Sequence, residues 1–82
     1  MQTIMVDGSR YADARELHLA LRRMLSLPDY YGMNADALND CLSERNEPVN
    51  LWIAGSGEGE TAAALNMVRR VVEENGGNVK EL

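Results

Sequence analysis

The sequence predicts an α/β fold in which a small three-stranded parallel sheet is covered by about three helices. Short apolar runs alternate with longer segments in which apolar residues recur at helical spacing. The predicted order is strand, two helices, strand, helix, strand, and this alternation favours right-handed crossovers between parallel strands. A chain of 82 residues has room for one domain, which we place at residues 1–82.

Boundary residues mark the first strand and the first helix. The apolar run TIMV precedes an Asp-Gly turn signal, which predicts a short buried strand. Helical spacing then begins near Asp13, a suitable N-cap, and Glu16 completes a capping-box pattern. Because Pro28 disfavours a helical conformation at Leu27, we expect this helix to end at Leu27.

A second helix is predicted from Met33 or Asn34 to about Glu44. Gly32 suits the tight turn before it, and Asn34 is a favourable N-cap. The side of this helix that we expect to face the core carries Ala37, Leu38, Cys41 and Leu42. The side that we expect to face solvent carries Asp36, Asn39, Asp40 and Ser43.

The second half of the chain supplies two more strands and the third helix. The run VNLWIAG predicts a strand, and its unbroken Leu-Trp-Ile stretch indicates burial on both faces of the sheet. The glycine-rich segment SGEGE leads to a helix over about Thr61 to Asn75, and Gly76-Gly77 is a stop signal for it. The tail NVKEL predicts a short third strand.

Composition and charge disfavour several classes of partner. The formal net charge is −5, and residues 29–47 alone sum to −4. Binding a phosphate backbone needs lysine and arginine, so this balance argues against nucleic acid and for a positively charged partner. The chain has one cysteine and no long apolar run, so we expect a cytoplasmic protein without a membrane segment. We also expect a monomer that needs no cofactor.

The pair Asp36 and Asp40 is the strongest candidate for a binding feature. Carboxylates four residues apart on a helix repel each other slightly, and they readily accept donors from arginine or lysine. Plainer interpretations stand beside this one: surface aspartates are usually just solvated, and Tyr30 and Tyr31 serve either as contacts or as packing residues. A divalent-cation site formed with Asp29 is disfavoured, because no loop-carbonyl pattern is visible.

Residues 16–42 carry a long pattern without gaps. It contains Leu17-His18 in a helix that ends in Leu27-Pro28, then acid-Tyr-Tyr-Gly, Asn34 and Asp-Ala-Leu-x-Asp-Cys-Leu. This pattern closely resembles that of barstar-like proteins, which are intracellular inhibitors of secreted microbial ribonucleases. The resemblance implies a three-stranded parallel sheet covered by helices. Outside residues 16–42, only the order of the elements matches the family.

The resemblance also implies a mechanism and a set of contact residues. The loop and the second helix would block the active site of a basic microbial ribonuclease or nuclease toxin, with carboxylates in place of the RNA phosphate. Asp40 resembles the central phosphate mimic, with Asp36 as its companion. The predicted partner-binding residues are Tyr30, Tyr31, Gly32, Asn34, Asp36, Asn39, Asp40 and Ser43. No catalytic or metal-binding residue is predicted, and the chain is not expected to be an enzyme.

Two residues depart from the family pattern. Asn39 stands where the family often has a tryptophan that packs on the enzyme. Arg70 aligns with a position at which the last helix usually supplies an acid. The single histidine, His18, has no nucleophile at a recognisable spacing, so we interpret it as structural.

The alternative function class is a small nucleotide-binding or enzymatic α/β domain that uses the glycine-rich turn at residues 55–59. The spacing of these glycines matches neither a dinucleotide fingerprint nor a P-loop. Glu58 and Glu60 would also repel a phosphate. The sequence therefore favours a flexible connection at this turn, and an inhibitor or immunity protein as the function.

Overall fold

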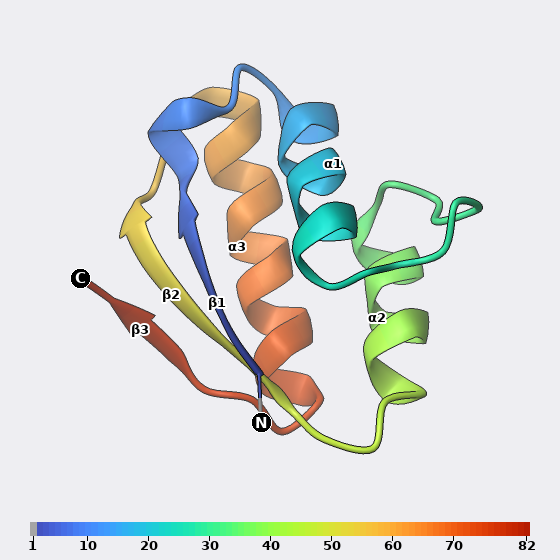
Figure 1. Cartoon of the computed structure of the whole chain (residues 1–82). Coiled ribbons are helices and arrows are strands. Elements are labelled where there is room, and N and C mark those ends of the chain that lie inside the picture. Colours follow the sequence, from blue (N-terminus) through green and yellow to red (C-terminus); the bar gives the residue numbers. More distant parts are fainter. Residues whose placement is uncertain (1) are drawn as a thin grey trace.

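A three-stranded parallel sheet and three α-helices make up the fold, as the sequence predicts (Figure 1). The computed structural model describes residues 2–82. The elements in chain order are β1 (Gln2–Asp7), the 3₁₀ helix η1 (Gly8–Arg10), α1 (Ala14–Met24), α2 (Ala35–Ser43), β2 (Val49–Gly55), α3 (Gly59–Glu74) and β3 (Val79–Glu81). Strand β2 lies in the centre, and both of its pairings are parallel. Within this range no helix is long and apolar enough to cross a membrane.

The helices cover one face of the sheet and leave the other open (Figure 1). The covered face contributes the buried strand residues Ile4, Val6, Val49, Leu51 and Ile53. On the open face Met5 is 57% exposed and Trp52 is 38% exposed. The prediction that β2 is buried on both faces is therefore wrong, because no helix packs on its second side. Lys80 partly covers Trp52 instead, with its Nζ 5.3 Å from a ring centroid.

Local hydrogen bonds explain where α1 begins and ends. Asp13 Oδ1 accepts a 2.9 Å hydrogen bond from the Glu16 N–H, which confirms the predicted N-cap. The helix ends before the predicted Leu27, because Ser26 adopts a left-handed conformation with φ of 53°. The Leu27 N–H then donates to the Arg22 carbonyl at 2.9 Å, a bond typical of a Schellman motif.

Helix α2 is short and depends on packing for its position. Asn34 Oδ1 accepts a 2.8 Å hydrogen bond from the Ala37 N–H, so the predicted N-cap is confirmed. Leu38 and Leu42 are buried, and α2 packs against α3. Figure 1 shows α2 and the loop before it on the side of the molecule away from β3. The polar side of α2 is thereby left facing solvent.

The end of α3 is held by two glycines. Gly76 has φ of 84°, and the Gly77 N–H donates to the Val72 carbonyl at 2.9 Å, which confirms the predicted stop signal. Gly77 is a glycine for a second reason: a Cβ there would overlap the Val49 carbonyl oxygen and lie 2.8 Å from Val72 Cγ1. The close approach brings the chain from α3 alongside β2 and into β3.

Replacing Gly77 with alanine should therefore destabilise the fold. The added methyl group has no free space and must displace β2 or α3, so we expect a loss of about 3 kcal/mol in the free energy of unfolding. Urea denaturation measures it. The neighbouring substitution Asn78→Ala, at an exposed side chain, should change stability by less than about 0.5 kcal/mol. Equal small effects at both positions would contradict the packing described for Gly77.

Candidate functional site

The loop between α1 and α2 begins and ends with residues in the left-handed conformation. These are Ser26, with φ of 53°, and Met33, with φ of 59°. Such conformations cost free energy for residues other than glycine, so the surrounding structure must hold the loop in place. Gly32 has no such conformation but lies close to α2: a Cβ there would lie 3.2 Å from Ala37 Cβ, closer than ordinary van der Waals contact. The tight turn expected at Gly32 is thus made by the neighbouring Met33.

The two adjacent tyrosines of this loop have opposite environments. Tyr30 is 88% exposed, whereas Tyr31 is 5% exposed. The Tyr31 hydroxyl lies 2.7 Å from Nδ1 of His18 and also donates to the Asn34 carbonyl at 3.4 Å. Tyr30 is therefore available to a partner, and Tyr31 anchors the loop to α1.

His18 and Tyr31 are both neutral near pH 7, and burial favours the neutral form of each. It lowers the pKa of His18, because the charged imidazolium would lose its hydration. It raises the pKa of Tyr31 well above its usual range, because a phenolate would lose its hydration in the same way. The pair is then a neutral hydrogen bond inside the core, which agrees with the structural role predicted for His18.

Asp36 and Asp40 both lie on the exposed side of α2. Within residues 2–82 neither carboxylate forms an ion pair or a hydrogen bond. Asp40 borders a groove that it shares with Tyr30, and Asp36 borders a smaller depression with Arg70 of α3. No cluster of three metal-binding side chains forms in the described part of the chain. The two carboxylates are thus available to cationic groups from outside.

The other polar residues of the predicted site are tied to the protein itself. Asn39 Oδ1 accepts a 2.8 Å hydrogen bond from Asn75 Nδ2, which joins α2 to the end of α3. The Ser43 hydroxyl donates to the Asp40 carbonyl at 2.9 Å. Asn34, besides capping α2, donates from Nδ2 to the Gly32 carbonyl at 3.1 Å. These bonds orient the site and leave the carboxylates as its unpaired groups.

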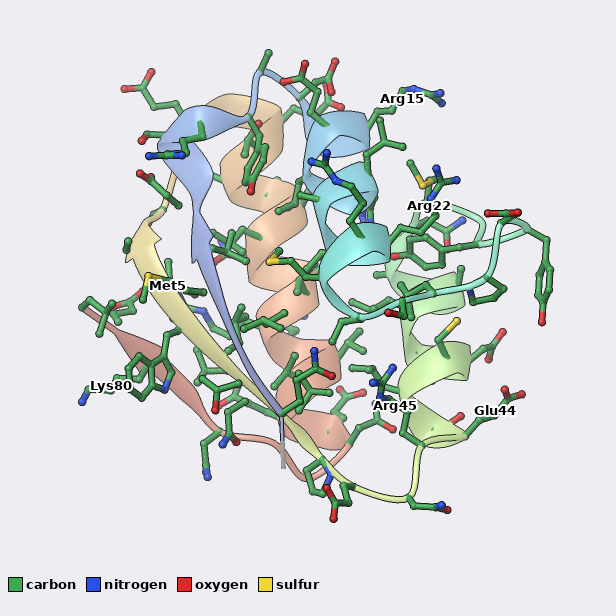
Figure 2. All side chains as sticks on the ribbon, viewed as in Figure 1. Met5, Arg15, Arg22, Glu44, Arg45 and Lys80 are labelled. Carbon is green, nitrogen blue, oxygen red and sulfur yellow. The ribbon has the colours of Figure 1, made fainter. Side chains whose placement is uncertain are left out.

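Arg45 is a supporting residue that the sequence did not reveal. Its Nη1 donates to the Leu25 carbonyl at 3.1 Å, and its Nη2 donates to Gln2 Oε1 at 3.0 Å. The guanidinium therefore fastens the end of α2 to the end of α1 and to β1. Figure 2 shows Arg45 turned toward the body of the protein, while Glu44 beside it points away. Partners 20 and 43 residues away give no local sequence signal.

Close backbone packing accounts for Gly57, in the turn considered for nucleotide binding, and for Gly8 of η1, which lies against it. A Cβ on Gly8 would lie 2.8 Å from the Gly57 nitrogen, and a Cβ on Gly57 would lie 2.9 Å from the Gly8 carbonyl oxygen. Gly57 also has φ of 72°. The nearby Glu58 is exposed at the start of α3, where its charge disfavours a phosphate. Gly57 thus has a structural explanation that needs no bound nucleotide.

The fold and helix α2 together define a class of protein: small α/β domains in which one helix carries exposed carboxylates and the loop before it an exposed aromatic residue. The sequence profile of one family, described as "Barstar (barnase inhibitor)", matches residues 1–78, and the chain belongs to this family. The resemblance seen in residues 16–42 is thereby confirmed. The chain is also 46% identical over 43 residues to a protein of Bacillus subtilis (strain 168) described as "Putative ribonuclease inhibitor YrdF". That match covers 52% of this chain and 47% of the relative, about half of each.

Replacing Tyr31 with phenylalanine tests its anchoring role. The substitution removes the hydroxyl and leaves the buried His18 nitrogen without its partner, so we expect a loss of about 1 to 3 kcal/mol in unfolding free energy. The matched control is Tyr30→Phe, which removes the same hydroxyl from an exposed ring and should leave stability unchanged. Urea denaturation of both variants measures the difference, and equal stabilities would refute the anchor.

The buried His18 should also make stability depend on pH. Its pKa is lower in the folded chain than the unfolded value of about 6.5, so the unfolded state binds more protons below that pH. Stability should therefore be constant above about pH 7, fall as the pH drops below about 6.5, and level off below the folded pKa. Because the chain has one histidine, His18→Asn should flatten this slope in urea titrations. An unchanged slope in that variant would contradict the assignment.

Proposed function

We propose that this chain inhibits a basic microbial ribonuclease or nuclease toxin by inserting its α1–α2 loop and α2 into the active site. The observation that carries the proposal is the pair Asp36 and Asp40, exposed on one short helix and without an ion pair among residues 2–82. Membership of the barstar family and the similarity to a protein described as a ribonuclease inhibitor support it. In this role the chain acts in the cytoplasm as an immunity protein or antitoxin.

The carboxylates act as a substitute for RNA phosphate. A ribonuclease binds phosphate with arginine, lysine and histidine side chains, and these donors form strong charge-assisted hydrogen bonds with carboxylate oxygens. Asp40 is the proposed central acceptor, and its position on the same groove as the exposed Tyr30 supports this role. The net charge of −4 in residues 29–47 draws a basic enzyme toward this face and speeds association.

The two departures from the family pattern bear on the choice of enzyme. Asn39 is engaged with Asn75, so this position offers a polar surface where an aromatic contact is usual. Arg70 places a cation between Asp36 and Glu74 on the lining of the depression between α2 and α3. A cationic group of the partner set directly opposite Arg70 would be repelled, so we infer that the cognate enzyme presents a neutral or acidic group at that point.

Calorimetry with a microbial guanyl-specific ribonuclease tests the proposal. We expect the wild type to bind and the double variant Asp36→Ala/Asp40→Ala to bind about 30-fold more weakly or worse, a loss of 2 kcal/mol or more. The expected loss of affinity is taken in part from charge pairs of the complex between barnase and barstar, a member of this family, and does not come from the present structure. The control Glu58→Ala/Glu73→Ala removes two exposed charges that line neither the groove nor the depression, and it should bind nearly as the wild type does.

The same experiment distinguishes the alternative function. An inhibitor should associate more slowly as salt rises, because screening weakens attraction between exposed charges. A nucleotide-binding domain that uses residues 55–59 would give heat with a nucleotide, and that heat would survive substitution of both aspartates. Nucleotide binding of this kind, with no response to any basic nuclease, would overturn the proposal.

A further inference from the structure

A groove separates the α1–α2 loop from α2 and contains two carboxylates of the helix. Its volume is about 690 Å³. Its walls include Pro28, Tyr30 and Gly32 from the loop, Asp40 and Cys41 from α2, and Glu44 and Arg45 directly after α2. The loop wall is therefore mainly apolar and aromatic, and the other wall carries two carboxylates and one guanidinium, a net charge of −1. Such a combination suits a side chain that is flat, apolar on its faces and cationic.

Glu44 occupies an unfavourable position unless something outside the chain neutralises it. It is the C-cap of α2, where the helix dipole is negative and where a carboxylate costs free energy. The last turn of α2 has no basic residue, and Asp40 adds a like charge four residues before. A polar, uncharged residue at this position would avoid both penalties.

The neighbouring arginine does not relieve this charge. Arg45 directs its guanidinium to the Leu25 carbonyl and to Gln2 Oε1, and Figure 2 shows it turned away from Glu44. Within residues 2–82 Glu44 has no ion pair or hydrogen-bonding partner for its carboxylate. Its negative charge therefore remains available at the end of the groove.

The negative charges of Glu44 and Asp40 both act on Cys41, which lines the groove with them. Burial is the largest cause of a raised pKa at the Cys41 thiol, and the negative charges of Glu44 and then Asp40 raise this pKa further. Arg45 acts in the opposite direction and is the smallest of the four influences. The thiol, which lines the groove between the two acids, thus lies in a negative potential to which both contribute.

We propose that Glu44 is a further partner-binding residue and that, with Asp40 and Tyr30, it holds one arginine side chain of the partner in this groove. A guanidinium donates in two directions within its plane, so it can bridge carboxylates on successive helical turns. Its face stacks on an aromatic ring, which the exposed Tyr30 supplies at the opposite wall. A lysine makes a single point contact and lacks the stacking face. The inference rests on the proposed function, since it takes this face to be the docking surface.

A short cationic peptide tests the groove without any nuclease. Acetylated, amidated tri-arginine is titrated into ¹⁵N-labelled protein, and tri-lysine serves as the comparison peptide. We expect amide shifts centred on Gly32, Asp40 and Glu44, and tri-arginine binding more tightly than tri-lysine by about threefold. Glu44→Gln should weaken tri-arginine binding by about threefold or more. Glu73→Gln removes one exposed charge from α3 and should have less than half that effect.

The peptide titration can contradict the inference in three ways. Equal effects of Glu44→Gln and Glu73→Gln, shifts centred outside the groove, or no preference for arginine would overturn the inference. Thermal unfolding separates a structural role: Glu44→Gln should leave Tm unchanged or raise it, since it removes an unfavourable charge. A clear fall in Tm would also overturn the inference.

A nuclease that binds the wild type separates this inference from the proposed function. Glu44→Gln should then weaken the complex by about tenfold, as expected for the loss of a charge-assisted contact. If Asp40→Ala abolishes binding and Glu44→Gln changes nothing, the inference fails and the proposed function stands. If no basic nuclease binds but tri-arginine still occupies the groove through Glu44, the proposed function fails and the groove assignment stands.

Discussion

The hydrogen bond between His18 and Tyr31 holds the α1–α2 loop, the part of the candidate site that lies outside any helix or strand. The α1–α2 loop contains two left-handed residues outside glycine, Ser26 and Met33, and such a conformation persists only where other contacts impose it. A buried 2.7 Å bond from α1 to the centre of the loop supplies that contact. It draws Tyr31 into the core and leaves the preceding residue, Tyr30, projecting into solvent, so the aromatic part of the site follows from one interior bond.

The acidic part of the site, helix α2, is likewise held in place by residues other than those that would bind a partner. A nine-residue helix is marginal by itself, and α2 also carries repelling carboxylates. Its position therefore depends on contacts with the rest of the protein: Leu38 in the core, the Asn39–Asn75 hydrogen bond to α3, and Arg45, which fastens its end to α1 and β1. These contacts stabilise a set of carboxylates whose mutual repulsion is unfavourable in the free protein and is relieved when a cationic surface meets it.

The sequence predicted most of the fold because its signals are local. The apolar run VNLWIAG corresponds residue for residue to β2, and the caps of α1 and α2 were visible as single residues. The open face of the sheet was not predictable, because the exposure of Trp52 depends on how many helices pack on the strand and not on the strand itself. The same limit applies to the site. Its acids are evident from their spacing, whereas the separation of the two tyrosines depends on His18, 13 residues away from Tyr31.

The central claim is that the acidic face of α2 occupies the place of RNA on a nuclease, and competition tests it most directly. A non-cleavable deoxyoligonucleotide would be added in rising concentration, up to saturation, to a nuclease that binds this chain. Surface plasmon resonance would measure the binding of the chain at each concentration. The account predicts mutual exclusion, with the apparent affinity falling in proportion to the occupancy of the active site. A ternary complex, in which chain and oligonucleotide bind the enzyme together with undiminished affinity, would contradict it.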